Sequence, residues 1–216
     1  MNTVTTLSML PLMLMLAACS SPESSSPLSG VPAHASTTTA ASAQRTAMDD
    51  LNAFATDGYR LMDSLTSDLN DDGRPDALLV LDPPADGDKK LGQGTPRRVL
   101  IVVRGESGQL HEAARNDKIV PCSACGGLAG DPYAFTRVER GQFTISNGGG
   151  SRERWSDDYT FTYSTERKDW LLSKVTRSVS DEETNAHKAI ELTPKDFGDI
   201  TFKDFDPGKL PKVELP

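Results

Sequence analysis

The stretch DLNDDGRPDALLVL, residues 68–81, joins a turn-forming segment directly to a run of apolar residues. Asp, Asn and Gly favour turns, because Asp and Asn side chains bond nearby backbone amides and Gly accepts a positive φ. The residues that follow, Ala77–Leu81, are apolar without interruption, which is typical of a strand buried on both faces or in the middle of a sheet. The stretch therefore predicts a β-protein in which a tight loop leads into a central strand.

Further segments have the patterns of strands. Val99–Val103 is a second nearly continuous apolar run. Two other segments alternate apolar and polar residues, as half-buried strands do, with apolar positions at Phe143, Ile145, Tyr159, Phe161 and Tyr163. Turn residues separate these runs at Gly105–Gly108, Gly141 and Glu166–Lys168. The pattern predicts a mainly β fold, a single hairpin-rich domain built as an antiparallel meander.

Other segments are expected to contribute little regular structure. Met48–Ala55 has apolar residues at helical spacing, and we expect at most one or two short helices in the domain. Asp82–Pro96 is rich in Pro, Gly and charged residues, which predicts a long surface loop. The tail from Asp206 onward is predicted to be extended.

The turn-forming segment also has the chemistry of a calcium loop. A hard cation takes six to eight oxygen ligands at about 2.3–2.6 Å, and a short loop supplies them by curling with alternate residues pointing inward. Gly73 at loop position 6 permits the sharp turn, and Pro75 favours an extended conformation at Arg74. The spacing predicts a calcium site formed by the side chains of Asp68, Asn70, Asp72 and Asp76, the last directly or through water, and by the backbone carbonyl of Arg74.

A known calcium motif has this spacing. An EF-hand requires a bidentate Glu at position 12, where this chain has Leu79. The loop instead resembles the DxNxDGxxD element of FG-GAP repeats in integrin-type β-propellers, which also leads straight into a strand. The resemblance covers roughly Leu65–Leu81 and implies an ion but not a propeller, because the motif occurs once. The alternative is a turn that binds nothing; a bound calcium ion is expected to be structural.

Residues 1–18 have the pattern of a lipoprotein signal peptide. Ala17 and Ala18 precede Cys19 at the end of an apolar stretch, and Ser8–Ala18 is shorter than the roughly 20 apolar residues that span a bilayer. The pattern resembles bacterial lipoprotein precursors, which implies cleavage before Cys19 and its acylation. Several acyl chains anchor a protein stably, whereas one binds marginally. Ser20 in place of Asp implies, by resemblance to enterobacterial lipoproteins, the outer membrane.

The rest of the chain divides into a tether and a domain. Residues 19–45 consist mostly of Ser, Ala, Thr and Pro, so they bury too little apolar surface to offset the entropy of ordering and are predicted to be flexible. Residues 46–216 are the size of one β-rich globular domain. The formal net charge of −8 argues against nucleic acid as a partner. The expected partners are the membrane, reached through the lipid on Cys19, and an envelope protein or glycan.

Two cysteines remain once Cys19 carries lipid. In an oxidising compartment Cys122 and Cys125 are expected to form a structural disulfide. One alternative is a CxxC redox centre, which needs a thiolate stabilised at a helix N-terminus. Another is a zinc site, which needs two further ligands, for which His111 and His187 are the candidates within the domain.

Two further strings are distinctive, CGGLAGDPY (residues 125–133) and GGGSRERW (residues 148–155). They are similar to a CGG, GDP and GGS-then-Trp pattern of uncharacterised bacterial exported proteins, and this resemblance implies no activity. The glycines of the second string predict a bulge or tight turn, or else the close approach of a ligand to the backbone. Trp155, which follows Arg152 and Arg154, is either a core residue or part of a sugar-stacking or cation–π site.

Two functions of different classes follow from these observations. The first is a non-catalytic, lipid-anchored protein of the cell envelope, in the outer membrane, that has a structural calcium loop and a binding or structural role. The alternative is an envelope hydrolase that acts on glycan or peptide through acidic residues near the glycine-rich segment, such as Asp131, Asp157 and Asp158. A paired-carboxylate mechanism requires two acids to face each other across a cleft, about 5–9.5 Å apart.

Overall fold

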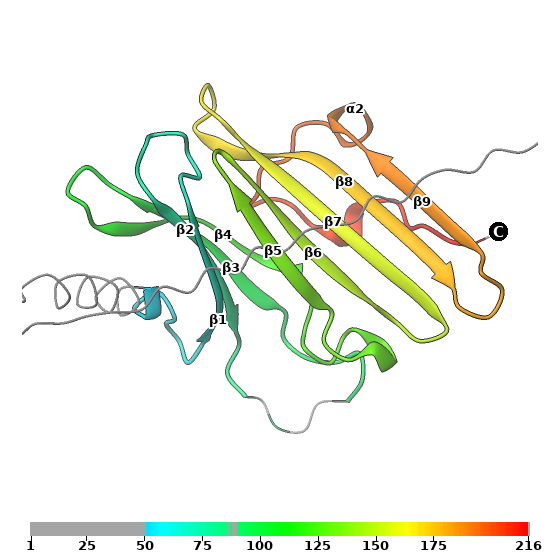
Figure 1. Cartoon of the computed structure of the whole chain (residues 1–216). Coiled ribbons are helices and arrows are strands. Elements are labelled where there is room, and N and C mark those ends of the chain that lie inside the picture. Colours follow the sequence, from blue (N-terminus) through cyan, green and yellow to red (C-terminus); the bar gives the residue numbers. More distant parts are fainter. Residues whose placement is uncertain (1–50, 86, 88–89, 216) are drawn as a thin grey trace, which may run out of the picture. The chain divides into compact units, whose positions relative to one another are not determined.

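A computed structural model of the chain describes residues 51–85, 87 and 90–215 (Figure 1). In this part of the chain, nine strands form two antiparallel sheets, which confirms the mainly β fold. Each sheet is a meander in which strands adjacent in sequence are also adjacent in space. No helix among the described residues is long and apolar enough to cross a membrane.

The first sheet has four strands and the second has five. The strands of the first sheet are β1 (Arg60–Ser67), β2 (Asp76–Asp82), β3 (Arg97–Arg104) and β4 (Leu110–Val120). Those of the second sheet are β5 (Tyr133–Glu139), β6 (Gln142–Gly150), β7 (Glu153–Ser164), β8 (Asp169–Asp181) and β9 (His187–Leu192). Short helical turns are found at η1 (Gly127–Ala129), α2 (Pro194–Phe197) and η2 (Pro207–Lys209).

The central strands β2 and β3 are buried on both faces, as their apolar runs predict. Their alternate residues belong to two separate apolar clusters. Val80 and Ile101 lie in the cluster between the sheets, together with Phe143 of β6. Leu79 lies on the opposite face of the first sheet, where Phe54 and its neighbours pack against it. The first sheet is therefore covered on one face by the second sheet and on the other by the segment that precedes β1.

The predicted helix at Met48–Ala55 falls partly outside the described residues, which begin at Leu51. Leu51 and Asn52 are helical. The signal peptide, Cys19 and the tether lie wholly outside the described residues. The predicted loop between β2 and β3 is present, although Asp82 is the last residue of β2.

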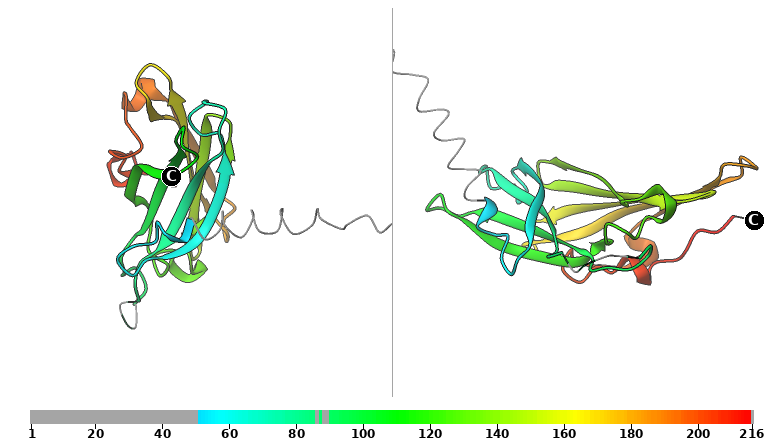
Figure 2. Two further views of the ribbon diagram at one scale, coloured as in Figure 1. Left: turned by 90° about the vertical axis from the view of Figure 1, so that its left-hand side faces the viewer. Right: turned by 90° about the horizontal axis from the view of Figure 1, so that it is seen from below.

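The segment after β9 returns beside β4 on the inward face of the second sheet, the face that looks toward the first sheet (Figure 2). The buried side-chain amide of Asn116 in β4 donates to the carbonyls of Phe202 (2.6 Å) and Phe205 (2.9 Å). The ring of Phe205 also packs edge-on against Tyr159, with centroids 5.0 Å apart. This C-terminal segment thus completes the layer that the first sheet begins. Beyond Asp206 it forms η2 before the predicted extended tail.

Candidate functional site

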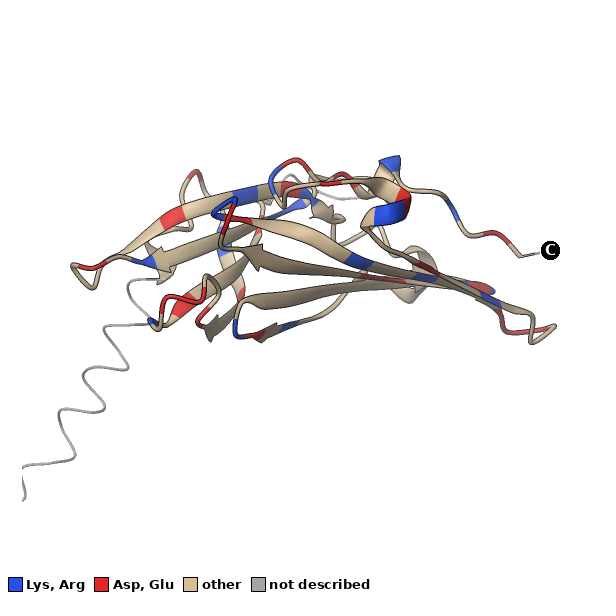
Figure 3. Cartoon of the chain, turned by 90° about the horizontal axis from the view of Figure 1, so that it is seen from above, with Lys and Arg blue, Asp and Glu red and all other residues tan. Residues whose placement is uncertain are grey.

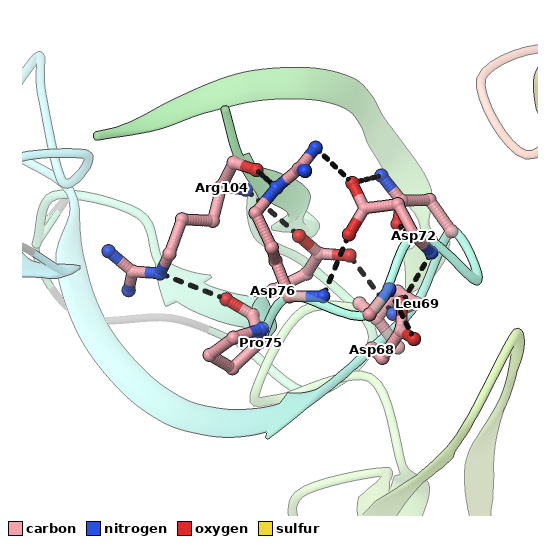
Figure 4. Close-up of polar contacts among 9 residues, drawn as sticks. Asp68, Leu69, Asp72, Pro75, Asp76 and Arg104 are labelled. Carbon is pink, nitrogen blue, oxygen red and sulfur yellow. Dashed lines mark hydrogen bonds and ion pairs between the residues drawn. The ribbon is translucent and has the colours of Figure 1, made fainter. Parts of the chain in front are cut away.

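The acidic loop, residues 68–76, connects β1 to β2 and closes on itself through bonds from its backbone amides to its own carboxylates (Figure 4). Asp68 accepts hydrogen bonds from the N–H groups of Asp72 (3.0 Å) and Gly73 (2.9 Å). Asp72 in turn accepts from the N–H of Arg74 at 2.8 Å. Gly73 has a φ of 85°, a conformation that favours glycine. Alternate carboxylates are therefore turned toward the inside of the loop.

Asp76 holds the two ends of the acidic loop together from a fully buried position. Its carboxylate accepts from the N–H of Leu69 (3.0 Å) and from the N–H of Arg104 in β3 (2.9 Å) (Figure 4). Burial raises the pKa of Asp76; the two amide hydrogen bonds oppose this effect, and the charges of Asp72 and Asp68 add to it. A carboxylate buried here is a structural part of the loop, because it satisfies two amides that would otherwise lack partners.

The carboxylate of Asp72 is less buried than that of Asp76. Its carboxylate accepts from the side-chain amide of Asn70 (2.9 Å) and from the guanidinium of Arg74 (2.6 Å). Burial opposes its ionisation, but the Arg74 N–H, Asn70 and the Arg74 charge outweigh that effect and hold the pKa of Asp72 below its ordinary value. Asp72 is therefore an ionised, partly accessible group.

The acidic loop is also attached to the second sheet. The N–H of Gly141, in the turn between β5 and β6, donates to the carbonyl of Asp68 at 2.8 Å. The buried indole N–H of Trp170 in β8 donates to the carbonyl of Leu69, also at 2.8 Å. Arg140 forms an ion pair with Asp68 at 3.4 Å. One loop of the first sheet thus contacts two separate elements of the second.

The donors of the acidic loop fit a calcium ion in kind. Each carboxylate has about four acceptor positions, and the loop amides use only some of those of Asp68 and Asp72. Asn70 and the Arg74 carbonyl add neutral oxygens, which calcium also accepts. Within residues 51–85, 87 and 90–215, however, no group of three or more His, Cys, Asp or Glu side chains is arranged to hold a metal ion. The predicted calcium site stays a prediction.

Cys122 and Cys125 lie at bonding distance in the turn that follows β4, with their sulfur atoms 2.08 Å apart. Cys122 is fully buried. The turn continues into the three-residue η1, whereas a redox CxxC needs a helix whose N-terminus stabilises a thiolate. The structural disulfide is the interpretation that this environment favours.

The two distinctive strings lie against each other. Gly126 and Gly127 of the first string contact Gly149 and Gly150 of the second, and we call this the glycine contact. The N–H of Gly150 donates to the carbonyl of Gly126 at 2.8 Å. A Cβ on Gly149 would lie 2.7 Å from that carbonyl oxygen, closer than atoms pack in proteins. The glycines therefore allow one backbone to approach another, which neither predicted alternative included.

Arg97, at the start of β3, is a structural residue that the sequence pattern did not single out. Its side chain is only 2% exposed. It donates to Asp82 at 2.6 Å and to both oxygens of Asp131 at 2.6 and 2.5 Å. Burial opposes ionisation of Asp131, but the Arg97 guanidinium and the Tyr133 N–H hold the pKa of Asp131 below its ordinary value. This ion pair between a buried guanidinium and a partly exposed carboxylate attaches the loop of the first distinctive string to the first sheet.

The three acids of the hydrolase alternative occupy different environments. Asp157 and Asp158 are neighbours in β7 and so point to opposite faces of the sheet. Asp158 accepts a hydrogen bond from Ser146, and Asp131 is bound to Arg97. Neither of the two cavities that Asp157 lines includes either of the other acids. The described cavities around Asp157 thus do not bring the three named acids together, and the hydrolase alternative stays a prediction.

No family model, curated protein or solved structure matches the chain. The function is therefore inferred from the chain's own residues. The acidic loop stands out among them, because it combines a ligand-like spacing with contacts to both sheets.

Proposed function

We propose that this chain is a lipid-anchored protein of the cell envelope with a non-catalytic binding or structural role, and that its acidic loop binds a structural calcium ion. One observation carries the calcium proposal. The loop with the ligand spacing is also the loop that both sheets contact, through Arg104 of β3 and Trp170 of β8. An ion that orders this loop would hold the sheets together.

The residues that would hold calcium are those at the ligand positions of the loop spacing. They are the side chains of Asp68, Asn70 and Asp72 and the backbone carbonyl of Arg74. Asp76 already binds two amides and would act directly or through water. The ion would supply positive charge to carboxylates that Arg74 and Arg140 now partly neutralise.

The anchor is proposed from the sequence of residues 1–19, and the lipid on Cys19 would place the domain at the outer membrane. The charge of the described residues is compatible with a partner other than nucleic acid, since acidic and basic residues are interspersed along the sheets and loops (Figure 3). The expected partner is therefore an envelope protein or a glycan.

Thermal melting of the full chain in detergent, in excess calcium and then in EDTA, tests the calcium proposal. Saturation at about 100 times Kd adds roughly 2.7 kcal/mol, which for a domain of this size raises Tm by roughly 5–10 °C. The fluorescence of Trp170, whose indole contacts the loop, should follow the same transition. Magnesium is the control ion, because it demands a smaller octahedral site and should give a smaller shift. Identical melting in calcium and EDTA would overturn the proposal.

The anchor has a separate test. Cys19→Ala should move the protein from the membrane fraction to the soluble fraction, because no acyl chain can be attached. Ser20→Ala, one residue away, should leave it with the membrane. If Cys19→Ala stays in the membrane fraction, another element anchors the chain.

A further inference from the structure

The inward face of the second sheet changes from apolar to polar toward the turn between β6 and β7. Residues paired across β6, β7 and β8 form successive rows on this face. The row in the core is Ile145, Tyr159 and Val175. The second row is Asn147, Asp157 and Arg177. The third row is Gly149, Trp155 and Val179. Polar and aromatic side chains are therefore aligned on a rigid strand surface.

Two cavities lie over these rows, with volumes of about 480 and 260 Å³. Both are lined by Trp155, Asp157 and Arg177, so we treat them as one groove. The C-terminal segment forms a wall of the larger cavity, and Arg177 fixes this segment by donating to the carbonyl of Pro211 at 2.9 Å. The combined size lies in the range of small-ligand sites, about 300–1,000 Å³.

Asn147 gives the first indication of what the groove binds. Its side chain is buried, 2% exposed, and lines the smaller cavity. The amide nitrogen donates to the carbonyl of Ile119 at 2.9 Å, but the amide oxygen has no partner among the described residues. A buried acceptor without a partner costs free energy, about 1–3 kcal/mol. A ligand in the groove that brings an O–H or N–H donor to this oxygen would remove that cost; because the oxygen is itself buried, the Asn147 side chain must turn toward the groove to meet the donor.

Trp155 gives the second indication. It is half-buried and belongs to neither apolar cluster. A Cβ on Gly149 would lie 3.0 Å from the indole, so the ring rests on the backbone of the neighbouring strand. Its indole N–H makes no hydrogen bond within the described part of the chain. Trp155 thus offers the groove both an aromatic surface and a donor.

The charged groups of the groove balance one another. Arg177 donates to both oxygens of Asp157, at 2.8 and 2.7 Å, and the Tyr159 hydroxyl donates to the same carboxylate at 2.8 Å. Three acids and three bases line the two cavities together, namely Glu153, Asp157, Glu214, Lys118, Arg177 and Lys212. This balance favours an uncharged ligand with polar groups.

We propose that the groove binds a neutral saccharide, with one sugar ring against Trp155 and a hydroxyl donating to the oxygen of Asn147. Sugar hydroxyls both donate and accept, as the unpaired groups of Asn147 and Trp155 require, and a pyranose ring has an apolar C–H face for the indole. Peptides commonly bind sheets by adding a strand at an edge, whereas this groove lies on a sheet face. The proposal rests on the non-catalytic binding role given above and is independent of calcium.

The test uses the full chain in detergent with maltohexaose, cellohexaose and chitohexaose as probes. At least one should bind saturably in calorimetry and should protect Trp155 from oxidation by N-bromosuccinimide, while Trp170, 3% exposed, serves as the internal reference. Trp155→Ala should weaken that binding roughly tenfold or more. Phe135→Ala removes an aromatic that is 44% exposed outside the groove, so it is the matched control and should bind as the native chain does.

Several results would overturn the proposal: no probe binds, Trp155→Ala binds as well as the native chain, or hexaalanine protects Trp155 as well as the sugars do. If melting shows that Trp155→Ala is unfolded, the protection of Trp155 in the native chain decides the question. Repeating the titrations in calcium and in EDTA separates the two proposals. Sugar binding without a calcium-dependent shift in Tm refutes only the calcium site. A calcium-dependent shift in Tm without sugar binding refutes only the saccharide proposal for the groove.

Discussion

The acidic loop and the glycine contact both help to join the first sheet to the second, but they do so by different physical means. In the acidic loop, carboxylates bind backbone amides, and Trp170 and Arg140 extend the network to the second sheet. In the glycine contact, two backbones touch directly because no Cβ separates them. The first arrangement depends on charge and therefore on ions and pH. The second depends on volume and should respond only to substitution.

The largest expected effect is steric. A Cβ on Gly126 would lie 2.2 Å from the carbonyl oxygen of Gly130, so Gly126→Ala should lower the free energy of unfolding by about 4 kcal/mol or more. Gly126 has a φ of −87°, which any residue adopts, so lack of space is the cause. Denaturant unfolding followed by circular dichroism measures the loss.

Gly130 in the same loop is the matched control. It has a φ of 91° but no atom near its missing Cβ, so Gly130→Ala should cost only the strain of that conformation, about 1–3 kcal/mol. Equal losses for the two variants would show that the turn around Gly126, which carries the glycine contact, is not limited by space.

The second-largest expected effect is the loss of the calcium response, which distinguishes the acidic loop from the glycine contact. Asp72→Ala should abolish the calcium-dependent rise of roughly 5–10 °C in Tm, because the loop loses an ionised ligand on its accessible side. Asp199→Ala is the control, since Asp199 is an exposed acid paired with Arg167 outside the loop, and it should keep the full rise. A calcium response that survives in Asp72→Ala would place the ion elsewhere. Gly130→Ala should keep the response as well.

The predicted disulfide between Cys122 and Cys125 would support the loop that carries the glycine contact. Cys122→Ser should lower the free energy of unfolding by about 2 kcal/mol, because it releases a short covalent loop. Cys125→Ser should cost about the same, and a reductant should destabilise the native chain but neither variant. Unfolding curves that do not respond to reductant or to these substitutions would show that no bridge contributes.

Much of this fold is predictable from local sequence. The apolar runs of β2 and β3 predict burial on both faces, and the clusters on either side of the first sheet confirm it. The glycine of the acidic loop predicts its sharp turn, where Gly73 has a φ of 85°. In both cases the residues that determine the structure are neighbours in the chain.

The remainder depends on partners far away in sequence. Gly149 is compatible with a bulge or a ligand until Gly126 is placed beside it. Arg97 precedes an apolar run and has the pattern of a surface residue, yet Asp82 and Asp131 surround it. Asn147 continues an alternating strand, and only the packing of β4 shows that it faces inward. Patterns within one segment predict strands and turns, but they do not predict which segments meet.

The smallest effect tests whether the surroundings of the glycine contact respond to pH at all. Arg97 holds the pKa of Asp131 below its ordinary value of 3.8. The unfolded chain therefore takes up this proton at a higher pH than the folded chain, so the ion pair stabilises the fold above about pH 4 and its contribution is lost as pH falls further.

Asp131→Asn should remove this contribution: the difference in unfolding free energy between native chain and variant should be constant near neutral pH and shrink below about pH 4. The effect is modest because the Asp131 carboxylate is partly exposed. A difference that stays constant through pH 3 would show that Arg97 serves as a space-filling residue, and that charge matters only in the acidic loop.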